Sequence, residues 1–208
     1  MKDYASLWLG YKAKKNNRDC SCLRSIHIAG ADETDECVKN AVSELKSGLK
    51  IMLDIEPEFD FGPGAAPIQI TDGKSILDSE EYKIFIDGEA LSIEAKSGAG
   101  ILYAAFDILR VIACEKSVEE AYASSKTVRP SNPLRMLNHW DNMDGSIERG
   151  YSGESFFYVD NEIVIDERTV DYARLIASVG INAVVINNVN VKDAASYMIT
   201  DRYFDKLA

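Results

Sequence analysis

The stretch that decides the fold class is Asp166–Ile186, DERTVDYARLIASVGINAVVI. Its first part places apolar residues at helical spacing, and Gly180 predicts the end of that helix. Its second part, Ile181–Ile186, is almost wholly apolar, which is typical of a parallel strand buried on both faces. Upstream, Leu134–Leu137 is a further short apolar run. Strand, loop, helix and strand in this order predict one βαβ unit and an α/β fold.

Polar side chains follow both predicted strands. Asn138–Asn142 follows the first strand, and Asn187–Asn190 follows the second. In α/β barrels and open parallel sheets, ligands bind at the C-terminal ends of the strands. One βαβ unit cannot close a barrel, and a lone parallel pair leaves strand edges exposed. Either this segment packs back on the N-terminal part, or the chain is a truncated piece of a longer α/β protein, and the second interpretation is favoured.

The N-terminal part follows a different pattern and predicts a small α+β domain with a mixed or antiparallel sheet. Asp87-Gly88 between two alternating segments is a strong signal for a β-hairpin. Glycines and prolines between Asp54 and Pro67 predict a loop. Ala31–Thr34 suits a helix N-terminus. The expected elements are strands at Ser25–Ala29, Pro67–Ile70, Tyr82–Ile86 and Ala90–Ala95, and helices after Thr34 and over Gly98–Cys114.

The domain boundary is expected at Arg129–Pro133, where two prolines disfavour helix on both sides. We therefore predict an α+β domain over residues 1–128 and a separate unit with the βαβ pattern over residues 129–208. Gly98-Ala99-Gly100 has the beginning of a dinucleotide-binding pattern, but Tyr103 stands at the third glycine position. A tight turn at a helix N-terminus is the favoured interpretation.

Composition excludes several classes of partner. The chain has 208 residues, 46% of them hydrophobic, and a net charge of -11. This acidic balance argues against nucleic acid and against an anionic membrane surface as partners. No apolar run approaches the roughly 18–20 residues that span a bilayer, and no signal peptide is evident. The four cysteines give neither a disulfide scaffold nor a zinc spacing, so a reduced, cytoplasmic protein without a metal is expected.

The segment Asn138–Gly153, NHWDNMDGSIERGYSG, crowds amide, imidazole, indole, carboxylate and guanidinium groups after one strand. Indoles stack on sugar faces, amides and carboxylates bond hydroxyls, and arginine pairs with carboxylates. The structural alternatives are that Trp140 is a core aromatic, His139 a core histidine and Glu148–Arg149 a structural pair. Each alternative is favoured when taken singly. At the C-terminal end of a barrel-type strand, the set together favours binding.

Two long motifs resemble the catalytic barrel of α-glucuronidases of glycoside hydrolase family 67. Leu134–Gly153 is similar to the start of that barrel, and Arg174–Val191 to its first helix and second strand. Ser97–Arg110 and Tyr4–Tyr11 resemble parts of the family's N-terminal region. The resemblance implies an inverting hydrolase that removes 4-O-methyl-D-glucuronic acid, α-1,2-linked to the terminal xylose of xylo-oligosaccharides, in xylan degradation. It also implies that residues 1–128 are an accessory domain and that residues 129–208 are the start of the catalytic barrel, namely the first βαβ unit of a truncated TIM (β/α)8 barrel. It implies no metal and no cofactor.

The resemblance also supplies the candidate site. Trp140 matches a tryptophan that lines the family's sugar pocket, and Val189 is expected to join it in an apolar wall for the O-methyl group. Five further residues at strand ends are expected to contact the sugar or to support those that do: Asn138, Asp141, Arg149, Asn188 and Asn190. The family's catalytic carboxylates lie on later barrel strands. Asp141, Asp144 and Glu148 do not match them, so no catalytic residue is assigned.

The expected protein is thus an N-terminal fragment of an α-glucuronidase, inactive alone, whose partners are glucuronoxylan-derived oligosaccharides. Members of the family often dimerise through their C-terminal region, so a homodimer is expected only of a full-length protein. One alternative is a non-catalytic carbohydrate-binding or interaction module. A weaker one is another hydrolase with this N-terminal domain, such as a hexosaminidase relative, against which Asn138–Gly153 argues.

Overall fold

The computed structural model describes residues 9–14, 20–62, 80–186 and 193–207. The chain divides into two compact units, one spanning Leu9–Pro133 and the other built from Leu134 onward. Each unit is described by itself. The mixture of helices with a mixed sheet confirms the α/β class.

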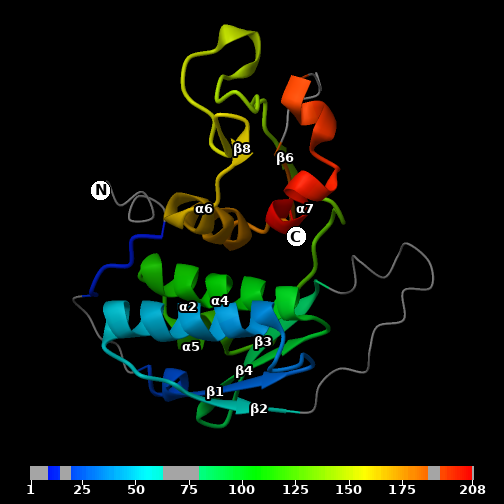
Figure 1. Ribbon diagram of the computed structural model, residues 1–208. Coiled ribbons are helices and arrows are strands. Elements are labelled where there is room, and N and C mark those ends of the chain that lie inside the picture. Colours follow the sequence, from blue (N-terminus) through cyan, green and yellow to red (C-terminus); the bar gives the residue numbers. More distant parts are fainter. Residues whose placement is uncertain (1–8, 15–19, 63–79, 187–192, 208) are drawn as a thin grey trace. The chain divides into compact units, whose positions relative to one another are not determined.

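A five-stranded mixed sheet forms the centre of the first unit (Figure 1). Its order is β2-β1-β4-β3-β5, with β1 parallel to both β2 and β4 and the other pairs antiparallel. The predicted hairpin is confirmed, because β3 and β4 pair around Asp87-Gly88. The strands are β1 (Ser25–Ala29), β2 (Glu58–Phe61), β3 (Tyr82–Asp87), β4 (Ala90–Ala95) and β5 (Lys126–Val128).

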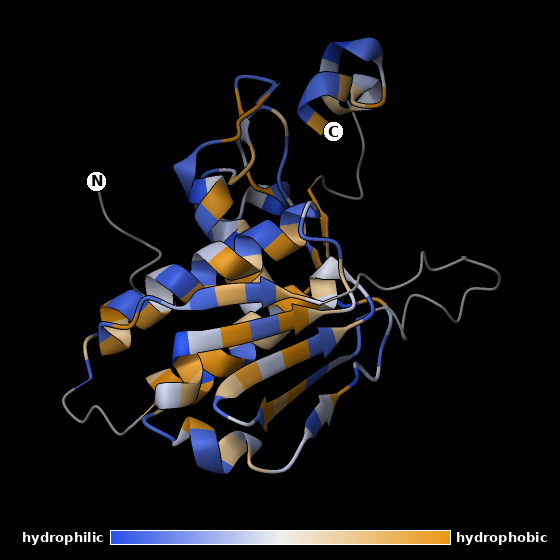
Figure 2. Ribbon diagram, turned by 90° about the horizontal axis from the view of Figure 1, so that it is seen from below, coloured by the Kyte–Doolittle hydropathy of each residue, from blue (hydrophilic) through white to orange (hydrophobic). Residues whose placement is uncertain are grey.

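Two long helices lie side by side against this sheet, α2 (Glu36–Leu53) and α4 (Gly98–Ala113) (Figure 1). The strands turn alternate residues toward this core: Ile26 and Ile28 are fully buried, whereas His27 between them is not. Figure 2 shows the resulting alternation of apolar and polar residues along the strands. A short helix α5 (Val118–Tyr122) and a 3-10 turn η1 (Ser21–Arg24) complete the unit.

Side-chain caps fix where the long helices begin. Asp35 accepts a hydrogen bond from the Cys37 N–H at 2.7 Å, so α2 begins at Glu36 and not within Ala31–Thr34. Ser97 caps α4 through the Gly100 N–H. A Cβ on Gly98 would lie 2.3 Å from an Asp35 carboxylate oxygen. The glycine pair of this turn therefore serves close packing.

The segment between α2 and β3 differs from its sequence-based prediction. The loop expected over Asp54–Pro67 is wrong in part, because β2 lies inside it. Its residues pair with β1 in parallel register, a non-local contact that local composition does not report. The strand expected at Pro67–Ile70 lies outside the described residues. No helix in the described part of the chain is long and apolar enough to cross a bilayer.

The second unit contains the predicted βαβ arrangement. Strand β6 (Met136–Asn138) pairs in parallel with β9 (Ala183–Val185), and α6 (Glu167–Ser178) lies between them in sequence. Asp166 and Thr169 form a reciprocal cap at the start of α6. The expectation of a strand buried on both faces is wrong for these residues. Strand β9 is only half-buried and β6 is exposed, because neither has a second neighbouring strand among the described residues.

A small aromatic core supports the loop between β6 and α6. The loop carries η2 (Glu148–Gly150) and the strand pair β7 (Tyr158–Val159) and β8 (Glu162–Ile163). The chain continues beyond β9 with η3 (Asp193–Tyr197) and α7 (Asp201–Leu207). The buried residues of this core are Met143, Phe157, Tyr158, Ile163, Met198 and Tyr203.

Candidate functional site

The candidate site begins where β6 ends. The His139 N–H donates to the Val185 carbonyl at 2.9 Å, so the chain continues beside β9 for one more residue. Asp141 then forms an isolated antiparallel bridge with Ile147, and the Glu148 N–H donates to the Trp140 carbonyl at 2.9 Å. These backbone contacts hold residues 139–141 as an extended segment. Side chains in such a segment point alternately to opposite sides.

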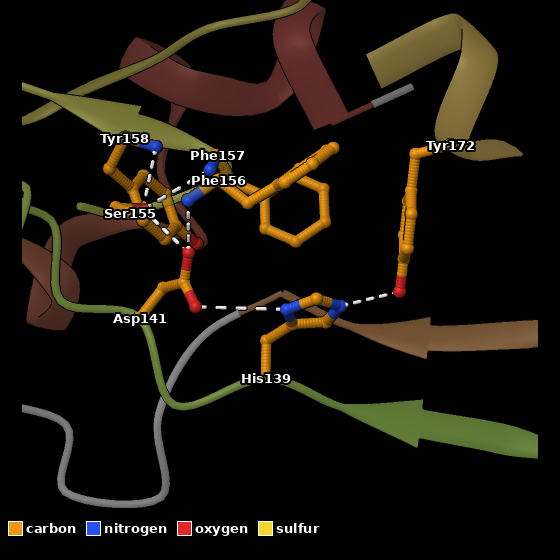
Figure 3. Close-up of polar contacts among 7 residues, drawn as sticks. All are labelled: His139, Asp141, Ser155, Phe156, Phe157, Tyr158 and Tyr172. Atoms are coloured by element: carbon orange, nitrogen blue, oxygen red, sulfur yellow. Dashed lines mark hydrogen bonds and ion pairs between the residues drawn. The ribbon is translucent and has the colours of Figure 1, made fainter. Parts of the chain in front are cut away.

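Asp141 faces inward and anchors the loop that follows (Figure 3). Its side chain is buried, and one carboxylate oxygen accepts hydrogen bonds from the Ser155 hydroxyl at 2.7 Å and the Phe156 N–H at 2.6 Å. The Ser155 oxygen in turn accepts from the N–H groups of Phe157 and Tyr158. One carboxylate therefore organises the turn at residues 155–158. A buried charge is tolerated here because it is hydrogen-bonded.

His139 faces the same side and links Asp141 to helix α6. Its Nδ1 lies 3.7 Å from the second Asp141 oxygen, and a 2.7 Å hydrogen bond joins its Nε2 to the Tyr172 hydroxyl. The imidazole meets the Phe157 ring edge-on, with centroids 4.8 Å apart. Burial, with a smaller contribution from the Asp141 charge, raises the pKa of Tyr172. The tyrosine therefore keeps its proton throughout the neutral range.

Trp140 has a different set of neighbours. Its ring lies 5.7 Å from the Arg149 guanidinium carbon and 6.2 Å from the centre of the Tyr151 ring. Trp140 is 40% exposed and Tyr151 60% exposed. Arg149 adopts a left-handed backbone with φ of 56°, and Gly150 follows at 69°, which folds this short turn back toward the indole. We call Trp140, Arg149 and Tyr151 the outer patch.

The outer patch has the chemistry of a site for acidic sugars. An exposed indole offers a flat apolar face on which a pyranose ring can stack, and a neighbouring guanidinium can form two hydrogen bonds to a carboxylate. The inner residues are already bonded to one another and offer no such surface. Among the described residues, no cluster of three or more histidine, cysteine or acidic side chains could hold a metal ion.

The structure brings two of the predicted site residues together, Trp140 and Arg149. Asn138 lies exposed at the end of β6, and Asp141 is buried beneath the loop. Asn188, Val189 and Asn190 lie outside the described residues. Of the residues covered by the structural alternatives, His139 is half-buried and hydrogen-bonded to Tyr172, whereas Trp140 is 40% exposed.

Sequence reasoning missed Tyr151, Ser155 and Tyr172. Tyr151 stands two residues after Arg149 inside the segment already singled out, so its aromatic ring was an available signal. Tyr172 lies on the predicted helix and is not distinguishable there from a residue of the apolar face. Ser155 acts through its hydroxyl group, whose contacts with Asp141 and with the following N–H groups depend on a loop geometry that the sequence does not report.

Comparison with known proteins shows similarity of this chain to part of the α-glucuronidases of glycosyl hydrolase family 67. Residues 115–208 match the model of the glycosyl hydrolase family 67 middle domain. A probable α-glucuronidase A from Aspergillus niger is 33% identical over 204 residues, which covers 88% of this chain and 23% of that protein. A probable α-glucuronidase A from Aspergillus oryzae is 43% identical over 122 residues, which covers 58% of this chain and 14% of that protein.

The solved structures include similar folds at low identity. A GH138 enzyme targeting pectin rhamnogalacturonan II has a TM-score of 0.50 and 16% identity, covering 88% of this chain and 22% of that one. At such identity the likeness concerns the fold alone. The chain spans about a quarter of the length of the curated relatives it matches.

Proposed function

We propose that the chain is the first part of an α-glucuronidase that acts on xylan fragments, because residues 115–208 match the middle domain of glycosyl hydrolase family 67. The complete enzyme removes (4-O-methyl-)D-glucuronic acid, α-1,2-linked to the terminal xylose of xylo-oligosaccharides. The observation that carries this proposal is the outer patch at the C-terminal end of β6. There an exposed Trp140 lies beside the cation of Arg149, which suits a pyranose ring that bears a carboxylate.

The second unit is, in this proposal, the first βαβ unit of a (β/α)8 barrel. Parallel pairing of β6 with β9, with α6 between them in sequence, supports this assignment. The exposure of β6 also supports this assignment, because further barrel strands and their side chains would cover that strand. The outer patch then lies at the end of the barrel where such enzymes bind substrate.

The catalytic carboxylates are proposed to lie on later strands of the barrel. An inverting glycosidase needs a general acid and a base roughly 6.5–9.5 Å apart, with room between them for the sugar and a water. Asp141 is unsuited to either role, because it is buried and its carboxylate already accepts hydrogen bonds from Ser155 and Phe156. We therefore propose that the 208 residues alone bind the sugar weakly or not at all, and do not hydrolyse it.

Product stereochemistry tests the reaction. The complete protein is incubated with an aldouronic acid, and the released sugar is followed by proton NMR before mutarotation. Inversion predicts that the β-anomer of the uronic acid is seen first. Early appearance of the α-anomer would contradict the inverting mechanism. Absence of any uronic acid release would contradict the function itself.

A second candidate, a non-catalytic carbohydrate-binding module, is favoured by the exposure of the outer patch within this chain alone. It is tested by titrating the 208-residue chain with the same acidic oligosaccharide and with its neutral counterpart. Preference for the acidic sugar, lost in Trp140→Ala and kept in Tyr197→Ala, would support the module. Tyr197 is a suitable control because it is an exposed aromatic residue of the same unit. No binding of either sugar would leave only the enzymatic proposal.

A further inference from the structure

We propose that His139, Asp141 and Tyr172 are positioning residues that fix Trp140 in the orientation needed to bind the sugar. The consequence for the sugar rests on the proposed function, whereas the mechanical part does not. The extended segment 139–141 turns His139 and Asp141 to one side, where they bond to the protein interior. Trp140 between them contacts Arg149 and Tyr151 instead.

The anchors come from two elements that are distant in sequence. Tyr172 belongs to α6 and bonds His139 across 33 residues, while Ser155 and Phe156 belong to the loop and bond Asp141. The indole is therefore attached on both sides of its own backbone position, by the residue before it to a helix and by the residue after it to a turn. A rotation of the segment that moved Trp140 would have to break contacts on the inner side.

The inner side offers little freedom for such a rotation. The imidazole packs against the rings of Phe157 and Tyr172, with centroids 4.8 and 5.5 Å away, and its side chain is mostly buried. Asp141 is 5% exposed. Loss of the Tyr172 hydroxyl would remove the hydrogen bond that sets the imidazole rotation but leave the aromatic contacts in place. Tyr172→Phe therefore separates positioning from packing.

The experiment on the 208-residue chain needs no sugar. The chain has two tryptophans, so the substitution Trp8→Phe leaves Trp140 as the only tryptophan. Excitation at the long-wavelength edge of the indole absorption, where tyrosine does not absorb, then reports on Trp140 alone. In that background, Tyr172→Phe and Asp141→Asn are compared with Tyr197→Phe, which removes a hydroxyl from an exposed tyrosine of the same unit. Time-resolved anisotropy measures the nanosecond motion of the indole, and far-UV circular dichroism checks the fold.

The expected result is a larger amplitude of local Trp140 motion in Tyr172→Phe and Asp141→Asn, with an unchanged dichroism spectrum and no change in Tyr197→Phe. Should Asp141→Asn unfold the unit, Tyr172→Phe alone decides. Unchanged Trp140 anisotropy in a folded Tyr172→Phe chain would overturn the positioning role. This readout remains informative even where the protein proves not to be a glucuronidase.

In the complete enzyme, Tyr172→Phe is expected to weaken substrate binding and to leave the rate of the chemical step almost unchanged. Loss of one hydrogen bond of this kind corresponds to about a twofold to tenfold change in a binding constant. Tyr172→Phe is accordingly expected to raise KM within that range and leave kcat nearly unchanged, because the catalytic groups are not touched. A fall in kcat at constant KM would show that Tyr172 does not act through Trp140. No activity in the wild-type protein would refute the proposed function and leave the anisotropy result standing.

Discussion

The contact between the two long helices allows a quantitative test of the packing in the first unit. Gly48 lies in the middle of α2, opposite Leu109 of α4, which is almost completely buried. A Cβ at position 48 would lie 2.5 Å from Leu109 Cδ2, 3.2 Å from Cδ1 and 3.4 Å from Cγ. Because all three branch atoms are close, no simple rotation of the leucine relieves the overlap. Gly48→Ala is thus a change in which helix propensity and packing oppose each other.

The two effects have different magnitudes. Alanine in a helix interior is favoured over glycine by about 0.5–1 kcal/mol. Forcing an additional methyl group into a well-packed core costs about 1–3 kcal/mol. Gly48→Ala is therefore expected to destabilise the unit by about 1 kcal/mol. Truncation of Leu109 to alanine costs about 2–5 kcal/mol on its own and also removes the atoms that the new methyl group would meet.

A double-mutant cycle measures the balance. In the Leu109→Ala background, Gly48→Ala is expected to stabilise by about 0.5–1 kcal/mol, so the sign of its effect reverses. Urea unfolding followed by far-UV circular dichroism gives the four free energies, and an unchanged urea dependence checks that the unfolding reaction is the same. A stabilising effect of equal size in both backgrounds would refute the argument that close packing requires Gly48.

Three further predictions concern the first unit. Burial, with a smaller contribution from Glu119, raises the pKa of the Cys22 thiol to about 12, whereas Cys114 is exposed. A thiol reagent at pH 8 should therefore label Cys114 well before Cys22, and equal labelling rates would contradict this. Burial also raises the pKa of the Tyr82 hydroxyl, so its contribution to stability is full below about pH 10 and is lost progressively as the pH rises further. The urea midpoint should therefore fall above pH 10, and it should fall less in Tyr82→Phe; an equal fall in both proteins would contradict this. Asp35→Ala removes the N-terminal cap of α2 and should lower the free energy of unfolding in urea by about 1 kcal/mol, whereas Asp35→Ser should be close to wild type. Equal stabilities of the two variants would contradict the capping role of Asp35.

The parts of the fold that the sequence predicts correctly are those determined by local chemistry. Asp87-Gly88 permits one kind of turn and so predicts the β3–β4 hairpin. Helical spacing predicts α4 and α6, whose observed ends differ by only a residue or so from the expected ones. Strand β2 shows the limit, since its four residues acquire a defined structure only by pairing with β1, more than thirty residues earlier.

The candidate site divides in the same way. Trp140 and Arg149 are predictable because their chemistry and their position after a strand point to binding. The hydrogen bond between His139 and Tyr172 is not predictable, because it depends on how the first turns of α6 lie against the end of β6. Asp141 is expected from the sequence either to contact the sugar or to support residues that do, and its buried bonds to Ser155 and Phe156 fit the supporting role.

The arrangement of residues 139–141 explains why neither a purely structural nor a purely functional interpretation of this segment is adequate. An extended chain presents successive side chains to opposite sides, so a run of three chemically active residues divides into two groups whatever its composition. Here the imidazole and the carboxylate are used internally, and the indole between them is exposed. The residues that hold the loop are therefore the immediate neighbours of the residue that is presented. A substitution in the inner pair should consequently change sugar binding through the orientation of Trp140, without any contact between the substituted side chain and the sugar.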